Sequence, residues 1–210
     1  MSKNEAIPLL CHSLGSKSEF TPEALVSAVR AERSLPAIPI PDVCVLDFDG
    51  DLTDWMVSAG VAHPFPSWAC FHTSMFTTEV DGSLCGVVAR TIGGPYAVLI
   101  AEQLAVSGAR AILGLTSAGR VSPLLPIPSL VVATQAIRDE GTSYHYLPPG
   151  ERIDALSGIP EILAAELSPL GIPVFQGPVW TTDAPYRETH EQLTRHARSG
   201  VLAVEMQAAS

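Results

Sequence analysis

Short apolar segments that alternate with helix-forming segments constrain the fold of this 210-residue chain more than any other feature. The apolar segments predict strands near residues 43–48, 84–91, 111–115, 130–134, 172–175 and 201–204. The intervening patterns predict helices over 21–32, 96–107, 160–167 and 187–198. This alternation is typical of an α/β sheet, in which ligands bind where loops leave the carboxyl ends of the strands.

Local signals set the ends of several elements. Thr21, Pro22 and Glu23 supply a capping hydroxyl, a proline in the first turn and an early acid, so a helix should run from there to about Glu32. A sharp turn at Gly93-Gly94-Pro95 should open the next helix, which ends at Gly108. We predict an irregular lead-in over residues 1–20 and a loop-rich stretch over 61–80.

Length and composition favour one compact domain. A chain of 210 residues, 47% of them hydrophobic and 16% charged, suits a single soluble domain over 1–210, in which 1–40 form an N-terminal lead-in and helix. No apolar run approaches the ~20 residues of a membrane helix, and the N-terminus is too weakly apolar for a secretory signal. We therefore predict a cytoplasmic protein with no membrane partner.

Charge and ligand spacing limit the partners. Lys and Arg number 12 against 22 Asp and Glu, a formal net charge of −10, which disfavours a nucleic-acid partner. A small anionic substrate remains compatible with this charge, because a few local arginines can hold it. The four cysteines and six histidines show no metal-ligand spacing, so we expect no metal and no cofactor.

An acidic motif directly follows the first apolar strand. Asp47-Phe48-Asp49-Gly50 resembles the first motif of haloacid-dehalogenase-type phosphatases, in which one aspartate is the nucleophile. That family also uses a lysine, and the only lysines of this chain, Lys3 and Lys17, precede the motif. Asp and Gly are ordinary turn residues as well, and we favour a strand followed by an acidic turn.

Five segments in a fixed order carry a more specific pattern. They read GGPY at 93–96, TSAG at 116–119, RDEGTSY at 138–144, TTDAPY at 181–186 and VEMQAA at 204–209. Together they resemble the nucleoside phosphorylase and nucleosidase superfamily, of the purine nucleoside and uridine phosphorylase type, over roughly residues 84–210. The resemblance implies a three-layer α/β/α fold with a mixed central sheet, of the phosphorylase/hydrolase kind.

The resemblance also implies an activity. A nucleoside phosphorylase is a pentosyltransferase of nucleotide salvage that cleaves the N-glycosidic bond of a purine nucleoside or uridine to the free base and ribose 1-phosphate. Phosphate is then a co-substrate, no cofactor is needed, and the protein is a homo-oligomer. Two alternatives stay open: a phosphate-independent nucleosidase, and a catalytically degenerate member that binds a nucleoside or serves in assembly.

Site residues follow from the matching motifs. The resemblance places Glu205, Met206 and Gln207 at the ribose, and Thr182, Asp183 and Tyr186 at the base. It places the phosphate and sugar loop at Thr116, Ser117 and Gly119, for which Arg90 and Arg120 are the candidate arginines. Gln207 stands where the family has a glutamate; its amide oxygen accepts a hydrogen bond but carries no charge, so we expect weaker ribose binding.

Two departures bear on catalysis. The family's phosphate arginines are missing: DGDLT occupies 49–53 and Gly114 the strand position, while carboxylates at 47, 49, 51 and 54 repel an anion. Two like charges ~4 Å apart cost about 4 kcal/mol at an effective dielectric constant of ~20. The family's general acid is an aspartate on a later strand, beyond residue 210, so the catalytic acid is unknown and we expect a C-terminally truncated member.

Overall fold

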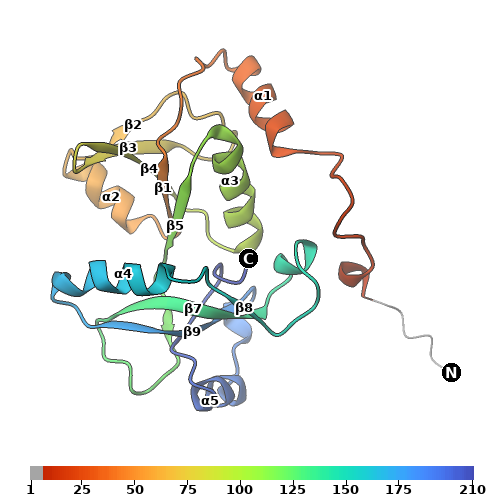
Figure 1. The fold of residues 1–210 in the computed structure, drawn as a ribbon, viewed down its shortest axis with the longest axis vertical. Coiled ribbons are helices and arrows are strands. Elements are labelled where there is room, and N and C mark those ends of the chain that lie inside the picture. Colours follow the sequence, from red (N-terminus) through yellow and green to blue (C-terminus); the bar gives the residue numbers. More distant parts are fainter. Residues whose placement is uncertain (1–6) are drawn as a thin grey trace. The chain divides into compact units, whose positions relative to one another are not determined.

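The structure is a computed structural model that describes residues 7–210; residues 1–6 of the predicted lead-in lie outside this range. The chain forms two compact units, one comprising Ser16–Ser117 and the other Ala118–Ser210 with the residues up to Gly15. Each unit contains a five-stranded mixed sheet (Figure 1). The predicted α/β class is confirmed, with the strands in two sheets instead of one central sheet. A single domain over 1–210 stays a prediction.

The sheet of the Ser16–Ser117 unit is built around β1 (Val43–Asp47). β1 lies between two parallel neighbours, β4 (Ser83–Ala89) and β5 (Ala111–Leu115). Antiparallel pairing adds β3 (Met75–Val80) to β4 and β2 (His63–Pro64) to β3. The prediction of a loop-rich stretch over 61–80 holds for 61–62 and 65–74, while β2 and β3 occupy the rest of it.

Helices cover both faces of this sheet. Alternate side chains of a strand point to opposite faces. Cys44 and Leu46 therefore pack with α3 (Gly94–Ser107), whereas Val45 packs with α2 (Asp51–Ser58). α1 (Pro22–Glu32) lies against α3 and completes that layer. The burial that excludes water also raises the pKa of the Cys44 thiol to about 11.

The predicted helix boundaries of this unit hold. The side-chain oxygen of Thr21 accepts the N–H of Ala24 at 3.3 Å, which is the capping bond expected for α1. Gly108 adopts the left-handed conformation that ends α3, with a φ of 112°. α2 was not predicted, because its first residues resemble an acidic turn.

The second sheet has the order β6-β10-β9-β7-β8. Its strands are β6 (Gly119–Arg120), β7 (Leu130–Asp139), β8 (Arg152–Asp154), β9 (Val174–Thr182) and β10 (Ala203–Glu205). β7, β9 and β10 run parallel, while β6 and β8 pair antiparallel at the two edges. The carboxyl ends of the three parallel strands therefore share one edge of the sheet.

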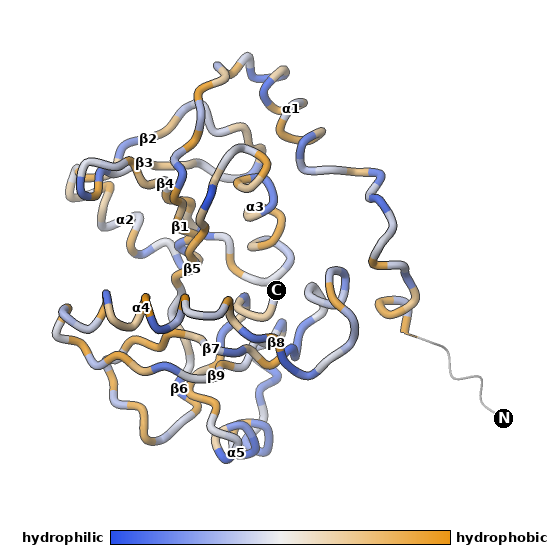
Figure 2. Tube along the Cα trace, in the orientation of Figure 1, coloured by the Kyte–Doolittle hydropathy of each residue, from blue (hydrophilic) through white to orange (hydrophobic). Residues whose placement is uncertain are grey.

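Helices also flank this sheet on both faces. α4 (Ile159–Leu167) packs on β7 and β9, and α5 (His190–Arg198) lies on the other side in Figure 1. α5 is hydrophilic over most of its length (Figure 2), and only a narrow stripe that includes Leu193 and Ala197 joins the core. Short 3-10 turns at Pro8–Leu10, Ser143–His145, Ser168–Leu170 and Pro185–Arg187 join the longer elements.

Residues 7–210 contain neither a candidate membrane-spanning helix nor a candidate metal cluster. Among these residues, no helix combines the length and the apolar character that crossing a membrane requires. Within the same range, no group of three or more His, Cys, Asp or Glu side chains is arranged to hold a metal ion.

Candidate functional site

Three of the predicted motif segments meet at one edge of the second sheet. Arg138 and Asp139 of β7 pair with Thr181 and Thr182 of β9. Thr181 also pairs with Glu205 of β10. The RDEGTSY, TTDAPY and VEMQAA segments therefore follow or end adjacent parallel strands, at the edge where ligand sites of α/β sheets form.

Glu205 is the central polar group of this edge. Its carboxylate is buried; one oxygen accepts the Thr181 hydroxyl at 2.5 Å, and the other accepts the N–H groups of Gln207 at 2.6 Å and Ala208 at 2.7 Å. Burial raises the pKa of Glu205, and these three hydrogen bonds partly oppose that shift. One oxygen thus holds the turn that carries the predicted ribose residues, and the other ties it to β9.

A second buried carboxylate stands close to the first. Glu140 accepts the N–H of Ser143 at 2.9 Å, the Ser143 hydroxyl, and the Ser210 hydroxyl at 3.0 Å. Its charge adds to the upward shift of the Glu205 pKa. Buried charges need such hydrogen bonds, because an unpaired carboxylate away from water is costly.

Arg138 completes the cluster of buried polar groups. Its Nε donates to the Ser143 hydroxyl at 2.8 Å and its Nη1 donates to the carbonyl of Pro148 at 2.8 Å. The guanidinium carbon also lies 4.3 Å from the centre of the Tyr144 ring, a cation–π contact. Arg138 is therefore engaged in holding the RDEGTSY segment.

The other two predicted ribose residues differ in their environment. Met206 is half-buried, whereas Gln207 is buried. The side-chain oxygen of Gln207 accepts the N–H of Met206 at 3.0 Å. The same oxygen is the one predicted to accept a hydrogen bond from a ribose hydroxyl. A bound ribose hydroxyl must therefore share this oxygen with the Met206 N–H or displace that N–H.

The predicted base-site residues lie at the end of β9 and in the segment that follows it: Thr182 is the last residue of β9, and Asp183 and Tyr186 come after it. The hydroxyl oxygen of Thr182 accepts the N–H of Ala184 at 3.2 Å. Asp183 accepts the N–H of Gly141 at 2.8 Å and so ties this segment to RDEGTSY. Tyr186 is fully exposed, at 100% of its reference area. Its ring is the one aromatic surface among the predicted base-site residues.

In the Ser16–Ser117 unit, a buried aspartate organises the carboxyl ends of the strands. Asp47 accepts the N–H of Gly50 at 3.2 Å, and from Thr53 it accepts the N–H at 2.8 Å and the hydroxyl at 2.7 Å. A carboxylate so engaged anchors the start of α2. This arrangement argues against the dehalogenase interpretation, which needs an open nucleophile.

Arg90 and Ser117 lie at the same edge, and carboxylates contact both. Arg90 Nη2 is 2.5 Å from a carboxylate oxygen of Asp54, while Asp49 accepts the backbone N–H of Ser117. The Arg90 side chain lies against Gly50, where a Cβ atom would be only 2.9 Å from Arg90 Cγ. The φ of 92° at this position also favours glycine.

The predicted phosphate loop is divided between the two units. Arg90, Thr116 and Ser117 belong to the Ser16–Ser117 unit, and the Thr116 hydroxyl donates to the Ser117 carbonyl at 3.0 Å. Gly119 and Arg120 form β6 of the other unit. A convergence of this loop and the ribose residues on one sugar-sized pocket stays a prediction.

β6 gives the two loop residues other contacts. A Cβ on Gly119 would lie 2.8 Å from Val204 Cγ1, so glycine allows close packing of β6 on β10. Arg120 is exposed, and its Nη1 donates to the carbonyl of Leu125 at 3.4 Å.

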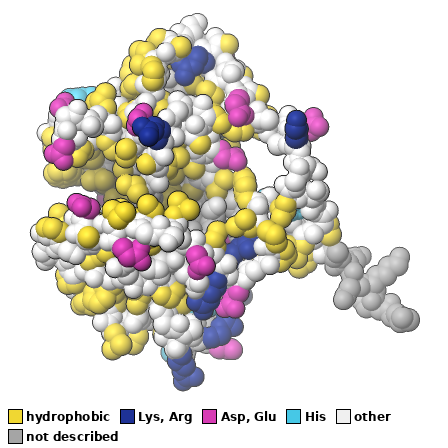
Figure 3. All heavy atoms as spheres, in the orientation of Figure 1, with side chains coloured by type: hydrophobic (Ala, Val, Ile, Leu, Met, Phe, Trp, Pro, Cys, Tyr) yellow, Lys and Arg dark blue, Asp and Glu magenta, His cyan; other side chains and the backbone are white. Residues whose placement is uncertain are grey.

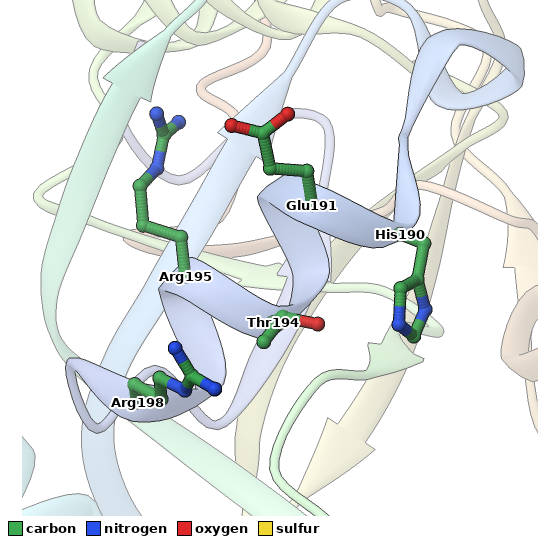
Figure 4. A pocket seen from close by; sticks show the side chains of 5 residues that line it. All are labelled: His190, Glu191, Thr194, Arg195 and Arg198. Carbon is green, nitrogen blue, oxygen red and sulfur yellow. The ribbon is translucent and has the colours of Figure 1, made fainter.

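One surface hollow was not predicted. It is lined by five side chains of the single helix α5, namely His190, Glu191, Thr194, Arg195 and Arg198 (Figure 4). All five are exposed or half-buried. The hollow therefore lacks the buried polar groups of the sheet edge.

Sequence reasoning also missed several buried polar partners. Thr181 and Glu140 lie within the quoted motifs but were not assigned a role. The Trp180 indole donates to Asp139 at 3.0 Å, and its ring centre lies 4.5 Å from that of His196. The signal for the Thr181–Glu205 pair is a threonine near the end of one apolar strand and a glutamate at the end of a neighbouring one.

Comparison with known proteins agrees with this motif set. A family model described as the phosphorylase superfamily matches residues 44–210. A guanosine phosphorylase of Halorubrum lacusprofundi is 32% identical over 134 residues, which are 62% of this chain and 54% of that protein. A uridine phosphorylase of Salmonella typhimurium is 30% identical over 97 residues, 46% of this chain and 35% of that protein. The matched part thus spans about half or less of these curated relatives.

A solved structure resembles this fold. The crystal structure of a uridine phosphorylase from Vibrio fischeri aligns with a TM-score of 0.71 and 19% sequence identity. The alignment covers 83% of this chain and 73% of that one. At this level of identity the likeness concerns the fold.

Proposed function

Because the chain belongs to the phosphorylase superfamily, we propose that it is a nucleoside phosphorylase that acts on a purine nucleoside or uridine. Phosphate attacks C1′ of the ribose, the N-glycosidic bond breaks, and the products are the free base and ribose 1-phosphate. Relatives named as guanosine and uridine phosphorylases support both base classes. The observation that carries the proposal is the meeting of RDEGTSY, TTDAPY and VEMQAA at one sheet edge.

We assign the ribose to the turn after β10. The thioether of Met206 packs on the sugar, and the amide oxygen of Gln207 accepts a sugar hydroxyl. Glu205 acts at the ribose by fixing this turn, since its carboxylate binds the N–H groups that follow it. Binding groups held in place in this way stabilise the positive charge that develops on the sugar as the bond breaks.

We assign the base to the end of β9 and the segment after it. Tyr186 offers an exposed ring on which a base stacks, and Thr182 and Asp183 supply polar atoms beside it. The Asp183–Gly141 hydrogen bond keeps this segment next to RDEGTSY. The chain is expected to act as a homo-oligomer without a cofactor.

We assign the attacking phosphate to the loop after β5. The guanidinium of Arg90 and the N–H of Ser117 are the donors that an oxyanion requires, and the Thr116 hydroxyl adjoins them. Gly119 and Arg120 are the further candidates from β6.

The test measures release of free base from uridine, guanosine and inosine with and without inorganic phosphate. We expect release only with phosphate, together with one equivalent of ribose 1-phosphate. Base release without phosphate would show a nucleosidase instead. Tight nucleoside binding without turnover would show a degenerate member. A Glu166→Gln variant, altered on the exposed surface of α4, serves as the matched control for variants of Glu205 and Gln207.

A further inference from the structure

We propose that Asp49 and Asp54 are internal counter-ions that set the phosphate affinity of this protein. Asp49 accepts the Ser117 N–H and Asp54 pairs with the Arg90 guanidinium, so an incoming oxyanion must displace both carboxylates. The inference rests on the proposed function in one respect: it takes phosphate as the ligand of these two donors.

The strand register brings three of the four groups together. Asp47, the last residue of β1, pairs with Ala89 of β4 on one side and Leu115 of β5 on the other. Asp49, Arg90 and Ser117 follow these three residues within a short loop each. They therefore leave three adjacent parallel strands at their carboxyl ends, where α/β sheets place small ligands.

The first donor is a backbone N–H. Ser117 is exposed, and its backbone N–H donates to the half-buried Asp49 carboxylate. A loop N–H of this kind is a usual donor to anions. The Asp49 carboxylate thus occupies the position at which an external anion would accept this N–H.

The second donor is the guanidinium of Arg90. Its backbone is fixed, because its N–H donates to the Asp47 carbonyl at 2.9 Å and its φ is 60°. The side chain then crosses Gly50 and meets Asp54 at 2.5 Å. The side chains of this ion pair are 59% and 60% exposed, so water and ions reach it and the pair opens at little cost.

The two carboxylates differ from their acidic neighbours at the end of β1 and the start of α2. Asp47 is buried and accepts three hydrogen bonds, so it stays in place. Asp51 is exposed, and the described residues give its side chain no hydrogen bond or ion pair. Asp51, the first residue of α2, therefore provides a control that has the same charge in the same region but contacts neither donor.

The test measures inorganic phosphate binding by isothermal titration calorimetry on the whole chain. The variants are Asp49→Asn, Asp54→Asn and the control Asp51→Asn, each of which removes one negative charge and keeps the side-chain shape. We expect Asp49→Asn and Asp54→Asn to bind phosphate on the order of tenfold more tightly than the parent, and Asp51→Asn to stay within about twofold. Equal affinities in all three variants would overturn the inference.

A second variant and a parallel activity assay make the result of this test unambiguous. Asp54 is exposed on α2, so Asp54→Asn tests the inference even if Asp49→Asn disturbs the loop. Base release is measured in parallel. Tighter phosphate binding by the two variants without base release would support the inference and reject the proposed phosphorolysis. Phosphate-dependent base release, with a phosphate affinity that neither substitution changes, would support the proposed phosphorolysis and reject the inference.

Discussion

Glu205 shows how one residue organises the polar end of a sheet. The motif predicted that it lies at the ribose, and its contacts add a role in holding the turn. Sequence reasoning did not reach that role, because its partner Thr181 becomes adjacent to Glu205 only after β9 and β10 have paired. Gln207 was predicted to bind ribose weakly for lack of charge. Its bond to the Met206 N–H is a further reason, which a sequence does not display.

Replacing Glu205 with glutamine tests this structural role. The carboxylate accepts three hydrogen bonds, whereas an amide has one accepting oxygen and an NH₂ group that would face N–H or O–H donors. We expect Glu205→Gln to lower the free energy of unfolding by about 1–3 kcal/mol in urea titrations. The exposed control Glu166→Gln should change it by less than about 0.5 kcal/mol. An unchanged stability of Glu205→Gln would contradict the role given to this carboxylate.

At the scale of elements, prediction succeeded where local chemistry decides the boundary. The Thr21 cap and the Gly108 end of a helix depend on neighbours in sequence, and α1 and α3 appear as expected. β5 also matches its predicted range of 111–115. By contrast, α2 begins at Asp51 after Gly50, and the same Asp and Gly residues also suit a turn. The choice of helix is made by the Asp47 bonds to Gly50 and Thr53.

β9 and β7 extend well beyond their predicted ranges for a similar reason. A proline interrupts the apolar pattern at Pro178, and proline in a strand lacks the N–H that the ladder needs. The sheet absorbs it through a register shift opposite Ala133 and Gln135, so β9 continues to Thr182. Such a bulge requires both strands. For this reason the pattern of one strand alone predicts too short an element.

The pairing of β6 with β10 gives a prediction about Gly119. A methyl group there would meet Val204 Cγ1 at 2.8 Å, so Gly119→Ala should cost about 1–3 kcal/mol of stability. In the double variant Gly119→Ala/Val204→Ala the clash is gone, and the total loss should be smaller than the sum of the two single losses. Urea titrations of all four proteins measure this coupling. Additive losses would show that Gly119 is not needed for packing.

Helix α5 gives a prediction about pH. His196 is buried against Trp180, and burial, followed by the charge of Arg195, lowers its pKa below the ordinary value of 6.5. Below that value the unfolded chain binds a proton more readily than the folded one. Its contribution to stability is therefore present above 6.5 and is lost as the pH falls through the lower folded pKa.

We expect the urea midpoint of the parent to fall more steeply between about pH 7.5 and 5.5 than that of His196→Phe. The exposed His190→Gln on the same helix should follow the parent. If His196→Phe and the parent show the same pH profile, burial of the neutral imidazole is not the cause of the acid sensitivity.

At the scale of the whole chain, charge is the property that bears most on function. The formal net charge is −10, and on the face drawn in Figure 3 acidic and basic side chains are interspersed instead of forming one basic patch. The proposed co-substrate phosphate is an anion and therefore meets a repulsive field that salt screens. The proposed nucleoside substrate is neutral and does not meet this repulsion.

This contrast leads to a salt-dependence prediction. Raising sodium chloride from about 0.02 to 0.2 M should lower the KM for phosphate by roughly twofold and leave the KM for the nucleoside unchanged. Steady-state kinetics with each substrate varied in turn measure both values. A phosphate KM that rises with salt would indicate a site dominated by its own arginines, in conflict with the paired state of Arg90.

The burial of Cys44 has a practical consequence. Alkylating reagents attack the thiolate, and a thiol with a pKa of about 11 in a closed core offers almost none near neutral pH. Cys70 is likewise buried, while Cys11 is exposed. A maleimide dye should therefore attach first at Cys11, which would give a fluorescent handle on this protein without any engineered cysteine.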